Sequence, residues 1–212
     1  MSKLQIMHAV LGPVQTNCYI VSVEGNSNVF LVDPGDEAER LIRFLDNEKL
    51  SVEAILLTHG HFDHIGAVDD LKKRYPEAVV YIGKNDSDML SDAGLNASFS
   101  LMGCGMSAHF DKVLRDQEKL TLLGVEITVI ETPGHTAGGV CYYIPEEKLL
   151  FSGDTLFAGS VGRSDLPTGS EAALIRSCKE KLLVLPDDTN VLPGHGSATT
   201  IAYEKEYNMY LG

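Results

Sequence analysis

The feature that most constrains this chain is a cluster of potential metal ligands in the segment LLTHGHFDHIG, at residues 56–66. The apolar run before it predicts a buried strand ending at Thr58, and four ligands follow within six positions: His59, His61, Asp63 and His64. Buried imidazoles need polar partners, and a carboxylate beside them is a costly charge unless a cation is present. Imidazole and carboxylate together suit zinc, iron or manganese. We therefore predict a metal site at the end of this strand.

The spacing within the cluster favours two metal positions. His59 and His61 can converge on one ion, whereas Asp63 and His64, beyond the bend, can point at another. Three more potential ligands follow predicted strands in the same way: His135 in ETPGHTAGG, Asp154 in FSGDTLF and His195 in LPGHGS. Five of the seven histidines then lie at strand ends beside glycine. The other two, His8 and His109, lack this setting, and we expect them to be structural or exposed.

The pattern along the chain predicts strands and helices interleaved in both halves. Runs rich in β-branched and aromatic residues predict strands at 4–10, 18–23, 29–32, 52–58, 79–82, 119–122, 125–131, 140–144, 148–151 and 191–192. Helical spacing is found at 38–49, 66–75, 170–183 and 199–210. Residues 83–110 predict a long, partly helical loop, which is a frequent place for substrate contacts. This order predicts an α/β (layered α+β) fold of two packed sheets flanked by helices, as one domain over residues 1–212.

Composition and charge exclude several classes of function. Seventeen lysines and arginines stand against 30 acids, and the net charge of −13 argues against nucleic acid as the main partner. No apolar run approaches the roughly 20 residues of a membrane span, and the N-terminus lacks the features of a signal peptide, so we expect a cytoplasmic protein. The four cysteines are scattered singly, and we expect Cys18 and Cys141 to be core residues.

The ligand pattern H-x-H-x-D-H, with a later His, an Asp and a final His, resembles that of the metallo-β-lactamase superfamily. The resemblance runs from TNCYIV and VDPG to PGHG and implies an αββα sandwich with two metals at its mouth. It implies that the first metal is bound by His59, His61 and His135, the second by Asp63, His64 and His195, and that Asp154 bridges them. Asp33 in VDPG resembles the family's aspartate behind the ligands, although a simple turn residue would also explain it.

Within the superfamily, the chain most resembles short bacterial glyoxalase II-like (hydroxyacylglutathione hydrolase-like) proteins, on GDTLFAGSVGRSDLPTGS and PGHGSATT. True β-lactamases usually carry Cys in place of Asp154 and lack the equivalent of His64. Longer glyoxalase II enzymes add a helical domain with basic glutathione-binding residues, whereas this chain ends shortly after His195 and has Ser197 where they have Tyr. Arg163 alone matches a basic substrate-contacting position.

The resemblance implies a hydrolase that cleaves a small-molecule thioester, possibly glutathione-derived, with a hydroxide shared between two divalent metals. Zinc is favoured, with iron or manganese as alternatives. Asp63 and Asp154 are the expected catalytic residues, Arg163 the expected substrate contact, and no nucleic acid or membrane partner is expected. Three alternatives remain open: a mononuclear-iron persulfide dioxygenase, which shares a GR-[ST]-D stretch, a lactonase, and a metal-stabilised binding module.

Overall fold

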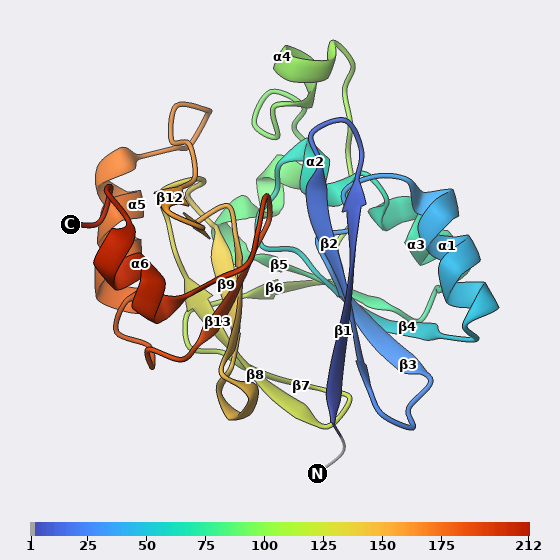
Figure 1. Cartoon of the computed structure of the whole chain (residues 1–212). Coiled ribbons are helices and arrows are strands. Elements are labelled where there is room, and N and C mark those ends of the chain that lie inside the picture. Colours follow the sequence, from blue (N-terminus) through green and yellow to red (C-terminus); the bar gives the residue numbers. More distant parts are fainter. Residues whose placement is uncertain (1–2) are drawn as a thin grey trace.

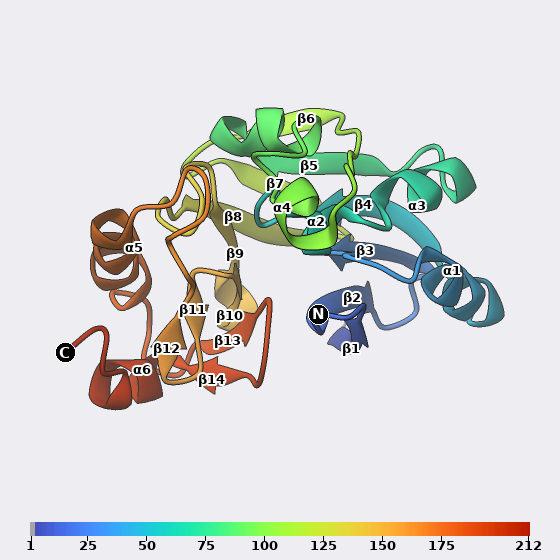
Figure 2. The ribbon, with the colours of Figure 1, turned by 90° about the horizontal axis from the view of Figure 1, so that it is seen from above.

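Two six-stranded sheets pack face to face between two layers of helices (Figures 1 and 2). The computed structural model describes residues 3–212. The first sheet has the order β1 (Leu4–Leu11), β2 (Thr16–Val23), β3 (Asn28–Val32), β4 (Ser51–Leu56), β5 (Val79–Gly83) and β6 (Lys112–Leu114). Its first three strands are antiparallel, and β3 to β6 are parallel. It is therefore a mixed sheet.

The second sheet is also mixed. Its order is β14 (Thr199–Thr200), β13 (Asn190–Pro193), β10 (Leu149–Gly153), β9 (Val140–Ile144), β8 (Val125–Glu131) and β7 (Lys119–Leu122). The pair β10 and β13 is parallel, and the other pairs are antiparallel. A small ribbon is formed by β11 (Leu156–Phe157) and β12 (Ser160–Val161).

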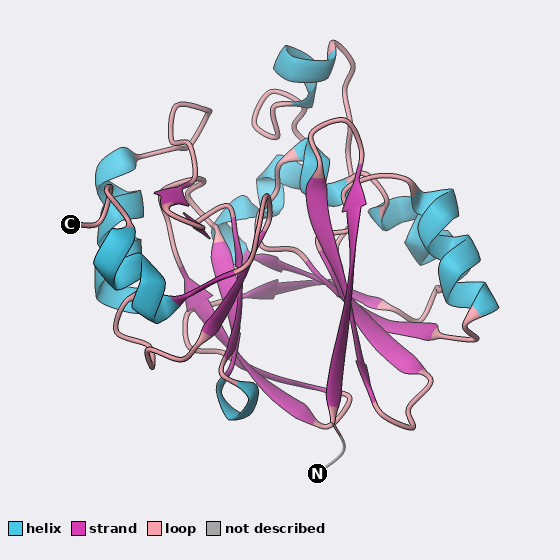
Figure 3. Cartoon of the chain, in the orientation of Figure 1, coloured by secondary structure: helices cyan, strands magenta, loops and turns pink. Residues whose placement is uncertain are grey.

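Helices cover the outer face of each sheet (Figure 3). The first sheet is covered by α1 (Ala38–Asn47) and α3 (Val68–Arg74), and α2 (Phe62–Ile65) follows β4 at one edge of the sandwich. The second sheet is covered by α5 (Glu171–Ser177) and α6 (Ile201–Tyr207). The short α4 (Ser98–Met102) stands above α2 in Figure 1. Shorter turns are the 3-10 helices Lys84–Leu90 and Pro145–Glu147 and the π-helix Cys178–Leu182. None of the helices described in residues 3–212 is long and apolar enough to cross a membrane.

Three apolar layers follow from the two-residue period of the strands. In β4, Ile55 faces α1 and α3, whereas Leu56 faces the other sheet. In β10, Leu150 packs toward α5 and α6, whereas Phe151 joins the layer between the sheets. Because both faces of these strands are covered, they appear in the sequence as continuous apolar runs. The predicted αββα sandwich is confirmed.

The differences from the predicted elements are local. The predicted helix at 66–75 begins at Val68, after the separate turn α2, and the helix predicted at 199–210 is preceded by β14 and ends at Tyr207. The Thr200 hydroxyl accepts a hydrogen bond from the Tyr203 amide and caps α6. Sequence patterns missed the strands β6, β11, β12 and β14, which have two or three residues each and are too short for a periodic signal. The segment 83–110 is partly helical, as predicted.

Candidate metal centre

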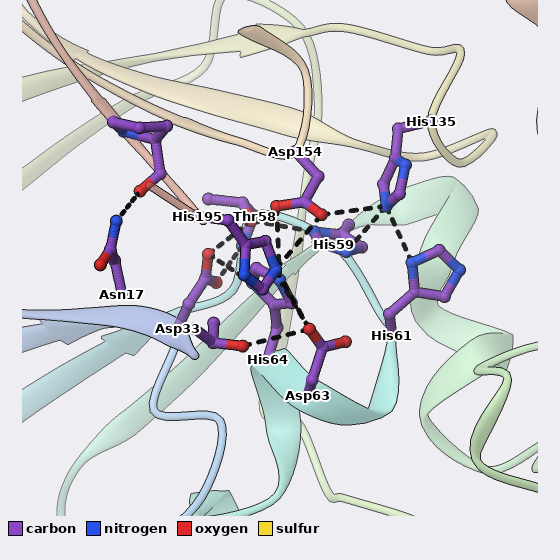
Figure 4. A network of polar contacts seen from close by, with 12 residues as sticks. Asn17, Asp33, Thr58, His59, His61, Asp63, His64, His135, Asp154 and His195 are labelled. Carbon is purple, nitrogen blue, oxygen red and sulfur yellow. Dashed lines mark hydrogen bonds and ion pairs between the residues drawn. The ribbon is translucent and has the colours of Figure 1, made fainter. Parts of the chain in front are cut away.

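The seven predicted ligands come together at one edge of the sandwich (Figure 4). The segment after β4 supplies four of them, His59 and His61 from the loop and Asp63 and His64 from α2. The loops after β8, β10 and β13 supply one each. Because β10 and β13 are parallel neighbours, their carboxyl ends lie side by side and bring Asp154 close to His195. The backbone N–H of Asn17, the second residue of β2, donates to the Gly194 carbonyl oxygen at 2.7 Å. This hydrogen bond joins the two sheets here.

Three imidazoles form the first ligand group. His135 Nε2 lies 2.9 Å from His61 Nδ1 and 3.2 Å from His59 Nε2. Two nitrogens that bind one tetrahedral zinc at about 2.05 Å lie roughly 3.3 Å apart, so these spacings fit a shared ion. All three side chains are buried. The His135 ring is held from behind, because its Nδ1 lies 2.7 Å from the Arg163 carbonyl oxygen.

The second ligand group consists of Asp63, His64 and His195. Asp63 Oδ2 lies 3.2 Å from His195 Nε2 and 3.6 Å from His64 Nε2. The Thr16 hydroxyl donates to the same oxygen at 3.1 Å. Asn17 holds the loop that carries His195, because its side-chain amide donates to the carbonyl oxygens of Pro193 and Gly196, both at 2.9 Å.

Asp154 lies between the two groups. Its Oδ2 is 3.6 Å from His135 Nε2 in the first group and 3.5 Å from His195 Nε2 in the second. Its Oδ1 is 3.5 Å from His64 Nε2. A Cβ atom at Gly194 would lie 2.3 Å from this Oδ1, so only glycine leaves room for the carboxylate beside His195. The geometry is that expected of a bridging ligand.

The electrostatics of the cluster fit a cation in both positions. Burial, then the neighbouring His135, lowers the pKa of His61 to about 3, so that its imidazole is neutral and has a lone pair free. Burial alone would lower the pKa of His64, but Asp63, Asp33 and Asp154 raise it to about 10. Among residues 3–212, the buried His64 Nε2 and Asp154 Oδ1 have no hydrogen-bond partner. Buried polar atoms normally have a hydrogen-bond partner, and coordination to metal ions would take the place of that partner here.

Asp33 contacts the ligand cluster from the side away from the cavity lining. It is 1% exposed, and its carboxylate accepts hydrogen bonds from the Thr58 amide at 2.8 Å and the Thr58 hydroxyl at 2.6 Å. Asp33 Oδ2 also lies 2.9 Å from His64 Nδ1. The Thr58 hydroxyl in turn lies 3.1 Å from His59 Nδ1. This carboxylate therefore contacts one ligand directly and a second through Thr58.

Sequence analysis missed Asp86, which is fully buried in the 3-10 helix after β5. Its carboxylate accepts hydrogen bonds from the Gly60 amide, between two ligands, and from the Thr136 hydroxyl, next to a third. The sequence pattern predicts a long, partly helical loop over residues 83–110 but singles out no residue within it. The signal that could have found Asp86 is its place just after a buried strand, which is where the ligands also lie.

The remaining predicted residues are placed as follows. Arg163 lines the same cavity as the ligands, but its guanidinium forms two hydrogen bonds to Asp165, at 2.7 and 2.8 Å. His8 is exposed and stacks on Tyr19, and His109 is exposed and pairs with an aspartate. These two histidines lie outside the cluster, as expected. Cys18 and Cys141 are buried core residues, also as expected.

The fold and the ligand cluster together define a metal-binding αββα sandwich. Comparison with known proteins identifies the family to which it belongs. Residues 11–195 match the metallo-beta-lactamase superfamily, and the chain belongs to that family. It is a metal-dependent hydrolase of this superfamily.

Relatives match over nearly their whole length. A probable metallo-hydrolase, YqgX of Bacillus subtilis, is 38% identical over 95% of this chain and 94% of its own. The hydroxyacylglutathione hydrolase GloC of Haemophilus influenzae is 38% identical over 93% of both chains. Among solved structures, the B3 metallo-beta-lactamase BLEG-1 has a TM-score of 0.93 and 41% identity, covering 98% of this chain and 99% of its own. TTHA1623 in a di-iron-bound form has a TM-score of 0.83 and 39% identity, covering 97% and 100%.

Proposed function

We propose that this protein is a thioesterase of the hydroxyacylglutathione hydrolase type, working with two divalent metals. The observation that carries the proposal is a carboxylate, Asp154, shared by two ligand groups at the wall of a cavity of about 330 Å³. Ligands of both groups line that cavity, so a substrate carbonyl can reach both metal positions. The similarity to GloC supports a glutathione thioester as the substrate.

The ligand sets assigned by resemblance fit this role. We propose His59, His61 and His135 for one ion and Asp63, His64 and His195 for the other, with Asp154 between them. Zinc is the proposed metal because imidazole and carboxylate suit it. Iron is the alternative, supported by the di-iron-bound form of TTHA1623. Divalent cations held here would lower the pKa of water and polarise the thioester carbonyl.

The chain's own residues would position water and substrate. Asp63 lines the cavity, where its carboxylate can orient a water molecule toward the carbonyl carbon and accept its proton. Asp63 is held for this by Thr16 and His195. Attack of the water oxygen forms the new C–O bond, and the C–S bond then breaks. Because a thiolate is a good leaving group, no separate acid is required.

The experiment that tests this proposal is hydrolysis of S-lactoylglutathione by purified protein, with the metal content measured on the same sample. We expect rapid turnover that a chelator abolishes and added zinc restores. No turnover by protein shown to contain two metals per chain would refute the proposal. Oxygen consumption with glutathione persulfide, or hydrolysis of a lactone, would then indicate the dioxygenase or the lactonase.

A second candidate is hydrolysis of β-lactams. Its support is the structural likeness to BLEG-1, which is named a B3 metallo-beta-lactamase and is 41% identical to this chain. Against this candidate, Asp154 and His64 depart from the pattern that is usual in β-lactamases. The same metal-loaded sample should be assayed with a chromogenic cephalosporin. A β-lactam kcat/KM above that for S-lactoylglutathione would reverse the order of the two candidates.

A further inference from the structure

The cavity at the metal centre has an apolar wall that no proposed ligand uses. Away from the ligands it is lined by Val14, Phe62, Leu101, Phe157 and Leu166. Val14 and Leu101 are large apolar side chains left 46% and 52% exposed. They come from the turn between β1 and β2 and from α4, elements far apart in the sequence. Apolar side chains that converge on a cavity mark a binding surface for an apolar group.

The same cavity offers little to a charged group. Among the residues described, 3–212, Arg163 supplies the one guanidinium or ammonium group in its lining. That guanidinium is already bound by the Asp165 carboxylate through two hydrogen bonds. The glutathione half of a thioester carries two carboxylates, so this half matches the apolar wall poorly.

We infer that this wall binds the acyl arm of the substrate, and that the enzyme prefers thioesters with an apolar acyl chain. The inference rests on the proposed thioesterase function and adds the class of acyl group. Burying one methylene is worth about fourfold in binding. A hexanoyl chain has four more methylenes than an acetyl group, and this open cavity would bury only part of them. We therefore expect kcat/KM for S-hexanoylglutathione to exceed that for S-acetylglutathione by more than about tenfold.

The test compares these two thioesters on one metal-loaded preparation, with the Leu101→Asn and Val14→Asn variants. Each variant should reduce several-fold the ratio of kcat/KM for the hexanoyl thioester to kcat/KM for the acetyl thioester, mainly through KM for the hexanoyl thioester. Phe99→Asn is the matched control, because Phe99 lies on the same helix and is 68% exposed but does not line the cavity. It should keep the full preference.

The outcomes separate the two proposals. Equal hydrolysis of both thioesters by the native protein would overturn the apolar subsite and leave the thioesterase standing. Hydrolysis of neither, with metal present, would instead refute the thioesterase. A preference that Phe99→Asn reduces as much as Leu101→Asn would also overturn the subsite, since α4 would then act only through its general structure.

A separate observation concerns Asp86 and does not depend on the substrate. One carboxylate oxygen, Oδ2, accepts from the Gly60 amide at 3.2 Å and from the Thr136 hydroxyl at 2.6 Å. The other, Oδ1, accepts from the Gly138 amide at 2.6 Å. A Cβ at Gly138 would lie 2.2 Å from the Asp86 backbone nitrogen, so the loops are in close contact. Gly60 lies between His59 and His61, and Thr136 follows His135.

We propose that Asp86 is a positioning residue for the first ligand group. Asp86 connects the two loops that carry the three imidazoles of this group. One loop follows β4 of the first sheet, and the other follows β8 of the second sheet. No Lys or Arg in residues 3–212 forms an ion pair with Asp86. A buried carboxylate without a cation is costly, and hydrogen bonds from both loops offset that cost. Substituting a residue that orients metal ligands typically lowers metal affinity by about 10- to 100-fold.

The test is a Co²⁺ titration of metal-free Asp86→Asn in two backgrounds. In Asp63→Ala, which removes a ligand of the second group, we expect Asp86→Asn to weaken the remaining site by about 10- to 100-fold. In His135→Ala, which removes a ligand of the first group, it should have little effect. Thr136→Val deletes one of the three hydrogen bonds and keeps the backbone contacts, so it gives a smaller shift in the same direction if Asp86→Asn does not fold.

A purely structural role would give a different pattern. The melting temperature of the metal-free protein would then fall while Co²⁺ affinity in both backgrounds stayed the same. That result, or equal weakening in the two backgrounds, would overturn the assignment.

Discussion

The two ligand groups share Asp154 but differ in burial and charge. In the first, His59, His61 and His135 are 2–4% exposed, and burial together with neighbouring imidazoles lowers the pKa of His59 and His61. In the second, the side chains of Asp63 and His195 are 13% and 26% exposed. The first group thus consists of buried imidazoles alone, whereas the second is more open at Asp63 and His195 and contains a carboxylate.

The surroundings of the two groups reinforce this difference. The first is braced by neutral groups at the ring nitrogens, namely the Thr58 hydroxyl and the Arg163 carbonyl. In the second, Asp33 contacts His64 directly, and three carboxylates raise the pKa of that histidine to about 10. The second group therefore has negative charge concentrated around His64, whereas the first is surrounded by neutral groups. Variants can test each half of this contrast.

The largest effect is expected for Asp154→Ala, because this carboxylate lies between the two groups and is close to histidines of both. Activity should fall well beyond the roughly 10- to 100-fold cost of changing a residue that only orients a ligand. Metal content should drop at both positions, as measured by elemental analysis of dialysed protein. Circular dichroism should match that of the native protein. Full activity would show that the two groups do not work as one centre.

The next largest effects come from His135→Ala and His195→Ala, which remove one imidazole from each group. Because His135 is buried, removing its side chain leaves an internal cavity at the first group. At the more exposed His195, water can take the place of the imidazole. We expect His135→Ala to lose the metal of the first group, and His195→Ala to keep the metal of the second group with weakened affinity. Elemental analysis and calorimetric titration would measure this. Equal losses would contradict the burial contrast.

The sequence patterns predicted both sheets and selected seven side chains that lie close together in the structure, because these side chains follow buried strands and a buried strand gives a local signal. Asp86 was not predicted because its partners, Gly60 and Thr136, are distant in the chain. Its place after a buried strand, as a single acid in a polar segment, did not distinguish it from a surface residue. The pairing of Arg163 with Asp165 escaped for a different reason. The two residues are separated by Ser164 alone, and the sequence does not say whether the guanidinium turns toward substrate or toward Asp165.

A smaller effect is expected for Asp33→Asn. Asn tolerates the left-handed backbone that Asp33 adopts, with φ of 51°, so the fold should survive. The substitution removes one acceptor and a charge beside His64. We expect metal affinity of the second group to fall by about 10- to 100-fold and that of the first group to change less, in a Co²⁺ titration. A larger loss at the first group would mean that the Thr58 contact matters more than the His64 contact.

The smallest effect is expected for Arg163→Ala. Its guanidinium is held by Asp165, whose pKa this hydrogen bond lowers to about 2, so at neutral pH the pair stays formed and little free charge faces the cavity. Ala keeps the backbone carbonyl that holds His135. We expect KM for S-lactoylglutathione to rise by at most about fivefold, with kcat nearly unchanged. Asp165→Asn is the matched variant: it frees the guanidinium and should lower KM for the same anionic substrate. If neither variant changes KM, Arg163 makes no contact with substrate, and its backbone carbonyl, which braces the first ligand group, is its one remaining link to the centre.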